Sequence, residues 1–493
     1  MRPAGTSPRG VAGATPDGVA GASSRGAAGA TPDGVAGTSS RGAAAWLDGG
    51  GPVGPPLTGD RRADVVVVGA GFTGLWTALA LTDRDPSLDV VVLEAAVVGH
   101  GASGRNGGFV DPSLTHGIHN GLAHFPGEID DLVRLGTENL AELTAFVRQH
   151  AIDCHLDLVG AIDVATEPWQ LAELEASVAI LDRAGERATL LDAEAMRKEV
   201  DSPTYLGGLA RPDGGGLVDP GALVRGLARV AGERGVTIHE GSPVVELRAA
   251  GTGVCAATPG GQVRADRAVI ATNAYSHRLL PRLGRWFVPV YDHVLLTAPL
   301  TAEQLGRIGW EGRQGLADTA NQFHYYRLTP DDRILWGGYD AIYRYGSQVG
   351  PRYDHRRATY DLLARNFRRT FPQLDDVPFD RWWGGPIATT TRFTVTFGAA
   401  LGGRAVWALG YTGLGVASSR FAGRVLTDRL LAPDSPLLDL AFTSTRPMPF
   451  PPEPLRWAGV ALTRRAIQRA DAREGRRGPW LALLDRFGIG FDS

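Results

Sequence analysis

Lysine is nearly absent from this chain, and cysteine is scarce. Lysine and arginine together number 50, and because only Lys198 is a lysine, 49 are arginines. The two cysteines, Cys154 and Cys255, cannot build a disulfide framework, and neither stands in a Cys-x-x-Cys or Cys/His spacing that holds a metal. The sequence therefore predicts no metal site, and free thiols of the kind found in a reducing compartment.

The chain also lacks long apolar runs and a strong charge of either sign. Apolar residues make up 43%, charged residues 21%, and the net charge is −3, which is ordinary for a globular protein. No run approaches the roughly 18 apolar residues of a membrane-spanning helix. The N-terminus has no apolar stretch of the signal-peptide kind. These absences predict a cytoplasmic protein with neither a nucleic acid nor a membrane as partner.

The first 58 residues differ in composition from the rest. The stretch 13–28, GATPDGVAGASSRGAA, recurs at 29–44 with one change, from Ala22 to Thr38. Sequence rich in Gly, Ala, Ser and Pro buries too little apolar surface to offset its ordering entropy. Residues 1–58 are therefore predicted to be a disordered low-complexity segment, with the folded chain beginning near Leu57.

A nucleotide-binding signature follows. Val65–Val68 is a β-branched run that leads into GAGFTG at residues 69–74, and Glu94 closes a second apolar run twenty residues later. Strand, Gly-x-Gly-x-x-Gly turn, helix, strand and acid stand in the register of a dinucleotide-binding unit. The alternative, a turn without a ligand, leaves three glycines and a correctly spaced acid unexplained.

Each residue of this signature has a physical role. Gly69 permits the tight turn, Gly71 lets the backbone approach a pyrophosphate, and Gly74 lets the helix lie close on the strand. The free N–H groups at the helix start then face the phosphates, whose charge the helix dipole favours. Glu94 would accept hydrogen bonds from the ribose hydroxyls.

Hydrophobic periodicity places further elements along the chain. Helical spacing predicts helices over residues 128–150, 192–200, 220–234, 354–371 and 417–430, and two basic amphipathic helices after Pro447 that pack on the body. Alternating or β-branched runs predict strands at 236–238, 244–247, 266–273, 286–345 and 382–409. A third strand–glycine–helix unit, VWALGYTGLGV, begins at Val406 and offers a helix N-terminus to a second negative or electron-rich group.

Three stretches carry a family resemblance: VVVVGAGFTGLWTALAL with VVVLE, then RAVIATNAYS, then WALGYTGLGVASSRFAG. Over roughly residues 62–432 they resemble the FAD-dependent D-amino-acid oxidase and glycine/sarcosine oxidase superfamily. The stretch HGASGRNGGFV is similar to the branch that contains γ-glutamylputrescine oxidoreductase. The three-segment order favours FAD over NAD, because NAD would explain the first motif but not the last.

The resemblance implies an α/β fold in which a Rossmann-like FAD-binding domain is interleaved with an α+β substrate domain built on an antiparallel sheet. The FAD-binding domain would comprise residues 59–115, 205–275 and 400–432, and the substrate domain residues 116–204 and 276–399. Residues 433–493 would form a C-terminal helical tail.

The resemblance also implies which residues hold FAD. The adenosine would meet Glu94 and the backbone at Val245, the pyrophosphate would meet the 69–74 turn, and the isoalloxazine would lie by the loop 103–108. The full set is Gly69, Gly71, Phe72, Thr73, Gly74, Glu94, Ala95, Ser103, Arg105, Asn106, Gly107, Val245, Thr272, Gly410, Gly413, Leu414 and Gly415.

Some members of the superfamily attach FAD covalently, through a histidine in that loop or a cysteine near the third segment. Here Arg105 and Asn106 occupy the histidine neighbourhood, and no cysteine follows Cys255. The flavin is therefore expected to be non-covalent, with His100 as the remaining alternative.

The implied reaction is oxidation of a C–N bond in a small amine or amino acid, by hydride transfer to flavin N5 followed by imine hydrolysis. Such a site needs shape, an aromatic wall and one or two polar anchors. The aromatic-rich strands supply His293, His324, Tyr325 and Arg327 as candidate catalytic residues. Structural roles for the histidines and a surface position for Arg327 are the alternatives. Tyr325 and Tyr326 point to opposite faces, and Arg327 follows on the face of Tyr325.

The sequence does not decide the roles of two other polar residues or the identity of the electron acceptor. Asp292, beside His293 in an apolar strand, either faces solvent or points at a ligand, and Arg392 could hold a substrate carboxylate. Sarcosine-type oxidases use a lysine near the flavin for reaction with oxygen, but Lys198 stands in a charged helix. Either a histidine or Arg105 supplies the positive charge, or an acceptor other than oxygen takes the electrons.

Two other functional classes compete with an amine or amino-acid oxidoreductase. A flavin monooxygenase shares the first motif and would need a flavin that NADPH reduces. A non-catalytic FAD-holding subunit of an electron-transfer complex would not need the aromatic-rich strands, because a relay needs no shaped pocket. The expected partners are thus a small amine and oxygen or another electron acceptor.

Overall fold

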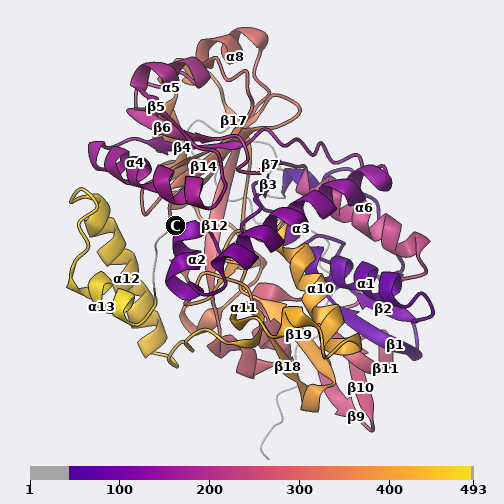
Figure 1. Ribbon diagram of the computed structural model, residues 1–493. Helices are drawn as coiled ribbons and strands as arrows, with labels where there is room; N and C mark the ends of the chain where they lie inside the picture. Colours follow the sequence, from indigo (N-terminus) through magenta and orange to yellow (C-terminus); the bar gives the residue numbers. More distant parts are fainter. Residues whose placement is uncertain (1–43, 490–493) are drawn as a thin grey trace, which may run out of the picture.

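The computed structural model describes residues 44–489 (Figure 1). Most of the predicted disordered segment lies outside these residues. Its last part, residues 44–58, is instead packed on the body: Trp46 is buried, and the Leu57 N–H donates to the Ser242 hydroxyl at 2.8 Å. The packed chain begins before Leu57 because one tryptophan and a few backbone hydrogen bonds anchor a stretch that is otherwise rich in glycine and proline.

An eight-stranded sheet forms the first half of the fold. Its centre is parallel, in the order β19 (Ala405–Leu409), β11 (Gly261–Ile270), β1 (Arg61–Val68), β2 (Val90–Leu93) and β8 (Thr237–His239). Antiparallel strands extend it at β18 (Thr396–Ala400), β10 (Gly253–Thr258) and β9 (Glu246–Ala250). This is the crossover topology that a Gly-x-Gly-x-x-Gly unit predicts.

Both faces of this parallel centre are buried. Val65 and Val67 pack against the helix side, whereas Val66 packs with the residues of the opposite face. The helix side consists of α1 (Phe72–Arg84), α3 (Ile129–Gln149), α6 (Pro220–Glu233) and α10 (Ser418–Leu431), which lie together in Figure 1. Burial on both faces explains the unbroken valine run, since alternation is needed only where one face meets water.

A nine-stranded, mainly antiparallel sheet forms the second half. Its path is β16 (Ile342–Tyr343), β12 (Val288–Thr297), β15 (Ile334–Gly338), β14 (His324–Leu328), β13 (Gly315–Asp318), β4 (Ala161–Ala165), β6 (Gly207–Arg211) and β5 (Thr189–Asp192), with β17 (Phe379–Thr389) paired to β12. Only β13 and β4 run parallel. A short pair, β3 (Phe109–Val110) and β7 (Gly216–Leu217), forms a separate two-stranded sheet.

The two faces of the second sheet meet different surroundings. One face packs its aromatic core, including Tyr326 and Trp336, against α9 (Arg357–Thr370). The other face presents Val294, Leu335 and Trp383 to Trp46 of the N-terminal segment. The remaining helices are α2 (Ile118–His124), α4 (Pro168–Arg183), α5 (Ala193–Glu199), α7 (Ser276–Leu279), α8 (Ala302–Ile308) and α11 (Ala441–Ser444).

The predicted fold class is confirmed, but some expected boundaries differ from the sheets. Strand β6, expected within the FAD-binding segment 205–275, pairs with β4 and β5 of the second sheet. Strand β18, expected in the substrate segment, pairs with β19 of the first. The strand expected at 244–247 begins at Glu246. Sheet membership depends on the pairing partner, which the local sequence pattern does not specify.

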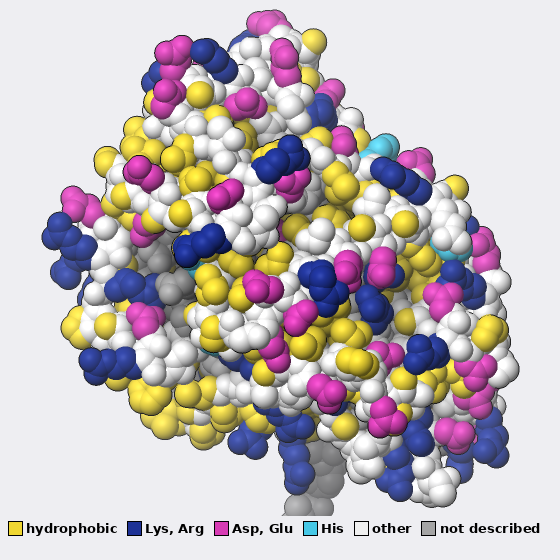
Figure 2. Space-filling model, in the orientation of Figure 1, with side chains coloured by type: hydrophobic (Ala, Val, Ile, Leu, Met, Phe, Trp, Pro, Cys, Tyr) yellow, Lys and Arg dark blue, Asp and Glu magenta, His cyan; other side chains and the backbone are white. Residues whose placement is uncertain are grey.

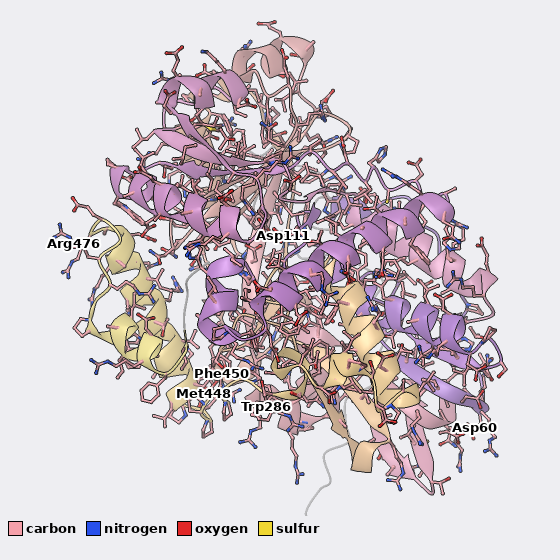
Figure 3. The ribbon with its side chains drawn as sticks, in the orientation of Figure 1. Asp60, Asp111, Trp286, Met448, Phe450 and Arg476 are labelled. Carbon is pink, nitrogen blue, oxygen red and sulfur yellow. The ribbon has the colours of Figure 1, made fainter. Side chains whose placement is uncertain are left out.

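The C-terminal tail forms a helical hairpin of α12 (Leu455–Asp471) and α13 (Pro479–Arg486), drawn in yellow in Figure 1. As predicted, it packs on the body: the Asp471 carboxylate accepts hydrogen bonds from the Asn321 and Gln322 N–H groups at 3.1 and 3.0 Å. The linker before the hairpin contains Met448 and Phe450 and passes close to Trp286 (Figure 3). Arg476 lies in the turn between the two helices of the hairpin.

The face of the molecule drawn in Figure 2 carries charges of both signs. Figure 2 shows arginine and lysine side chains interspersed with aspartate and glutamate over the face drawn. Within residues 44–489, no helix combines the length and hydropathy needed to span a bilayer. In the same range, no group of three or more His, Cys, Asp or Glu residues has the arrangement of a metal site.

Candidate active site

The glycine turn after β1 has the geometry that was expected at Gly69 and Gly74. Gly69 has φ +105°, a conformation that disfavours residues with a Cβ. A Cβ on Gly74 would lie 1.9 Å from the Gly69 carbonyl oxygen, so α1 can approach β1 only without a side chain there. A Cβ on Gly71 would lie 2.9 Å from the Ser103 hydroxyl, which closes the turn from the other side.

The start of α1 offers unpaired N–H donors. Phe72 donates its N–H to the Ser103 hydroxyl at 2.8 Å. Within residues 44–489, the N–H groups of Gly71, Thr73 and Gly74 have no recorded acceptor. Free N–H groups at the positive end of a helix dipole form an anion site, so this turn fits the pyrophosphate of a dinucleotide.

Glu94 lies where the second strand ends, beside this turn. Its carboxylate accepts hydrogen bonds from the Ala70 N–H at 2.9 Å and the Ala96 N–H at 3.0 Å. Glu94 therefore holds the glycine turn next to the chain that follows β2. Burial raises the pKa of Glu94. A carboxylate has about four acceptor positions, so two remain for ribose hydroxyls.

The expected adenosine contact at Val245 differs in detail. The Val245 side chain is 67% exposed, and its N–H donates to the Ala257 carbonyl at 2.9 Å. The Val245 carbonyl and the exposed side chain are the groups open to a ligand at this position.

The third glycine segment meets the first two. Tyr411 and Thr73 share a hydrogen bond between their hydroxyls, with an O–O distance of 2.7 Å. Gly410 donates its N–H to the Asn273 side chain at 3.0 Å, next to Thr272, whose methyl group lies by the Gly69 turn. Gly410 and Gly413 both have positive φ, at +87° and +100°, in the turn that contains Leu414 and Gly415 before α10. All three segments thus converge at the carboxyl ends of β1, β11 and β19.

Side chains from outside the loop hold residues 103–108. The Trp383 and Trp46 indole N–H groups donate to the Arg105 and Asn106 carbonyls at 2.8 and 2.9 Å. Arg327 donates to the Gly108 carbonyl at 3.1 Å. The loop is therefore held from the second sheet and the N-terminal segment, on the side away from the glycine turn.

Arg105 is a buried structural link between the two halves. Its guanidinium pairs with the Asp354 carboxylate at 2.6 Å and donates to the Gly384 carbonyl at 2.9 Å, with side-chain exposures of 15% for Arg105 and 7% for Asp354. The guanidinium also lies 3.3 Å from the His100 ring. Its positive charge is thus matched within the protein by one carboxylate.

Tyr325 and Asp292 form a polar pair against the loop. The Tyr325 hydroxyl donates to the Asp292 carboxylate at 2.5 Å. The Tyr325 ring lies so close to Gly107 that a Cβ there would come within 2.7 Å of it, and its centroid is 5.8 Å from that of Phe109. Burial raises the pKa of Asp292. Asp292 and Tyr325 thus form a carboxylate–phenol pair beside the predicted flavin loop.

His293 and His324 point to the opposite face of the sheet. His293 is fully buried against Tyr360 of α9, and neither ring nitrogen has a hydrogen-bond partner. His324 is held at both ring nitrogens, by the Gly337 carbonyl at 3.1 Å and the Asn366 amide at 2.9 Å. Burial lowers the pKa of His293 to about 3 and that of His324 to about 4, so both rings are neutral near pH 7.

Arg327 shares the face of Tyr325, as predicted, and its Nε and Nη1 donate to backbone carbonyls. It is 2% exposed and donates to the carbonyls of Leu328, Gly108 and Val218. Burial lowers its pKa to about 10, which leaves it protonated at neutral pH. Arg327 therefore links the loop to the segment between β7 and α6.

The side chains of Arg392 and Lys198 have their described partners outside this site. Arg392 donates to the Thr445 hydroxyl and carbonyl at 2.8 and 3.0 Å. Lys198, 73% exposed at its side chain, pairs with Glu194 one helical turn away, as its charged context predicted.

The sequence analysis assigned no site role to Trp46, Trp383 or Asp354, and left Asp292 undecided. The only local signal was the polar Asp292 in an apolar strand, because tryptophan is common in cores and gives no positional clue. Which face of β12 meets the loop is set by its pairing with β15 and β17, so the role of these residues required the fold.

Comparisons with known proteins give consistent results. A family model described as FAD dependent oxidoreductase matches residues 64–429. The chain is 34% identical over 395 residues to a γ-glutamylputrescine oxidoreductase of Escherichia coli, covering 79% of this chain and 88% of that protein. It is 30% identical over 395 residues to a probable oxidoreductase OrdL of Haemophilus influenzae, covering 78% and 86%.

Solved structures share the fold. The crystal structure of glycine oxidase from Geobacillus kaustophilus superposes with a TM-score of 0.65 at 20% identity, covering 78% of this chain and 99% of that one. At this level of identity the match concerns the arrangement of the two sheets and their helices.

Proposed function

We propose, because this chain belongs to the FAD-dependent oxidoreductase family, that it oxidises a C–N bond of a small amine or amino acid. The observation that carries the proposal is the position of Tyr325 and Asp292, which the second sheet places against the loop beside the glycine turn. A carboxylate at that position attracts an ammonium group. The Escherichia coli relative is named for γ-glutamylputrescine, an amine that would carry an ammonium group at neutral pH.

The residues of the site divide the work. FAD, when bound, supplies the hydride acceptor. Asp292 would bind the substrate ammonium and take one proton from it, leaving the neutral amine that is ready for oxidation. Tyr325 would hold the Asp292 carboxylate in place through its hydroxyl. Because burial raises the Asp292 pKa, this carboxylate is a stronger base than an exposed aspartate.

We further propose that FAD is bound without a covalent link. Cys154 and Cys255 are both buried, and Cys255 donates its thiol to Gln262 in the β10–β11 hairpin. His100, the remaining candidate, has its ring nitrogen 3.3 Å from the Arg105 guanidinium. Precipitation in acid should release the yellow colour into the supernatant, and colour retained in the pellet would contradict this proposal.

The electron acceptor proposed here is one other than oxygen. His293 and His324 are neutral at pH 7 and face α9, and the Arg105 charge is matched by Asp354. The remaining protonated group at the loop, Arg327, has no ion-pair partner among the described residues, but it is 2% exposed and donates to backbone carbonyls, which favours a structural role over stabilisation of superoxide. Stopped-flow mixing of substrate-reduced protein with oxygen should give reoxidation much slower than turnover with an artificial acceptor. Reoxidation that keeps pace with turnover would show an oxidase.

The experiment that tests the central proposal is anaerobic bleaching of the flavin between about 350 and 500 nm by a panel of amines. The panel includes sarcosine, glycine, D-amino acids, putrescine and γ-glutamylputrescine. Bleaching by one compound supports amine oxidation and identifies the substrate. Yellow protein that is bleached by none of them, or is bleached by NADPH alone, would overturn it.

A further inference from the structure

Two tryptophans from distant parts of the chain donate hydrogen bonds to the same turn of the loop 103–108. The Trp46 indole N–H donates to the Asn106 carbonyl at 2.9 Å, and the Trp383 indole N–H donates to the Arg105 carbonyl at 2.8 Å. The rings meet edge to face with centroids 6.5 Å apart, and they are 7% and 1% exposed. The two consecutive carbonyls therefore point toward one buried tryptophan pair.

This arrangement fixes the direction of two N–H groups. In a planar trans peptide the N–H points opposite to the C=O of the same unit. The N–H groups of Asn106 and Gly107 belong to the two gripped peptides, so they point away from the tryptophans. Within residues 44–489, neither N–H has a recorded acceptor, although Gly107 is buried.

Several neighbouring backbone groups of the loop are paired. The Gly108 N–H donates to the Asn106 side-chain carbonyl at 2.8 Å, the Gly108 carbonyl accepts from Arg327, and the Arg105 N–H donates to the Ala102 carbonyl at 3.3 Å. A buried backbone N–H almost always has an acceptor in a native protein. Two adjacent donors left free beside these paired groups therefore indicate a ligand acceptor atom.

Trp46 is itself fixed by its neighbours, so it can orient the peptide group between Asn106 and Gly107. Its own carbonyl accepts from the Arg225 guanidinium at 2.9 Å, and α6 packs so tightly on it that a Cβ on Gly221 would lie 1.9 Å from that carbonyl oxygen. The next residue, Leu47, packs against Gly104 at a distance that leaves no room for a side chain there. The N-terminal segment thus joins α6 to the loop.

We propose that Trp46 and Trp383 are positioning residues that aim the N–H groups of Asn106 and Gly107 at an electron-rich atom of the flavin ring. The inference rests on the proposed function, because it requires FAD at the loop. Two fixed donors stabilise the negative charge that the ring gains on reduction, so they raise its reduction potential.

The test compares three Trp→Phe variants of the full-length holoprotein. W46F and W383F keep an aromatic ring and lose the indole N–H. W336F is the matched control, because Trp336 is equally buried and its indole N–H has no partner. Each protein is assayed for its flavin absorption spectrum, its midpoint potential by dye equilibration and its thermal midpoint.

We expect the preference for reduced over oxidised flavin to fall about tenfold in W46F and in W383F, which is about 30 mV for a two-electron couple. The flavin bands should shift in both, and neither readout should change in W336F. A merely structural role would lower the thermal midpoint of all three without moving the potential.

Potentials and spectra of W46F and W383F that match those of W336F would overturn the inference. If a variant purifies with little flavin, its affinity is measured by titration with FAD. Weaker binding than that of W336F then supports the inference, and equal binding overturns it. Failure of the proposed function is distinguishable, since the unsubstituted protein would then hold no FAD or would be reduced by no amine.

Discussion

The eight-stranded and nine-stranded sheets prepare their sites with different chemical groups. At the first sheet, the groups that we propose contact the cofactor belong to the backbone: the free N–H groups of the α1 turn, which its glycines permit. At the second sheet, they come from side chains on one face, where Tyr325 and Asp292 meet the loop. We conclude that the cofactor half of the site is sensitive to any added Cβ, whereas the substrate half is sensitive to the identity of single polar groups.

The largest effect expected is loss of the cofactor from the first sheet in Gly74→Ala. The added methyl group would lie 1.9 Å from the Gly69 oxygen, so α1 must move off β1 and the N–H donors with it. We expect the FAD content per protein to fall at least about tenfold, as overpacking of this kind costs about 1–3 kcal/mol. Flavin absorbance against protein absorbance measures it. The control is Gly306→Ala in α8, where a Cβ meets nothing within 4 Å; equal FAD content in the two variants would contradict the expectation.

The second sheet should respond in the opposite way to Asp292→Asn. FAD content should stay normal while kcat/KM falls by about 10²–10⁴-fold, the usual contribution of a general base. In the unsubstituted protein, kcat/KM should decline as the pH falls through the Asp292 pKa, which burial raises above the ordinary range, because only the carboxylate form works.

The pH–rate profile of Asp292→Asn should lack this acid limb. Tyr325→Phe, which removes the hydrogen bond but keeps the carboxylate, should cost less and retain the limb. An Asp292→Asn protein with unchanged kcat/KM would show that the carboxylate has no part in the reaction.

The ion pair between Arg105 and Asp354, which links the two halves, should contribute to the free energy of unfolding. Asp354→Asn leaves the buried Arg105 guanidinium without its carboxylate, which costs about 3–5 kcal/mol for a buried pair. Chemical denaturation measures the free energy of unfolding. The matched control is Asp213→Asn, which breaks an ion pair with Arg187 whose side chains are 74% and 44% exposed and should cost about 0–1 kcal/mol. Similar losses in both variants would argue against a linking role for Arg105.

The smallest effect is expected at Lys198, which belongs to neither half of the site. Lys198→Ala breaks one exposed pair with Glu194, worth about 0.3–0.5 kcal/mol. Its rate of flavin reoxidation by oxygen should equal that of the unsubstituted protein in stopped-flow mixing. A clearly slower rate would place the only lysine of the chain at the flavin and contradict the structure.

The first sheet was largely predictable because its signals are local. A turn that needs φ > 0 selects glycine, a helix packed close on a strand excludes a side chain, and both requirements leave residues at fixed spacing, as at Gly69 and Gly74. The helices over α3, α6 and α9 were likewise found within a few residues, because amphipathic periodicity is a property of one segment.

The second sheet was predictable only in part. Alternation correctly separated Tyr325 from Tyr326, which bonds to Tyr205 on the other face. The alternation pattern does not show which face of the sheet meets the loop. His293 and His324 were therefore predicted as site residues together with Tyr325 and Arg327. The structure places the two histidines toward α9 and engages every ring nitrogen of His324 within the core.

The sequence by itself determined the dinucleotide turn, the FAD-type fold and the family resemblance, since each depends on residues close together along the chain. Tertiary structure alone decided that Trp46 and Trp383 grip one loop, that Arg105 pairs with Asp354 and that Asp292 meets Tyr325. These contacts join residues separated by 33 to 278 positions. Strand pairing and packing bring such residues together, and no local pattern records which distant partner a side chain will meet.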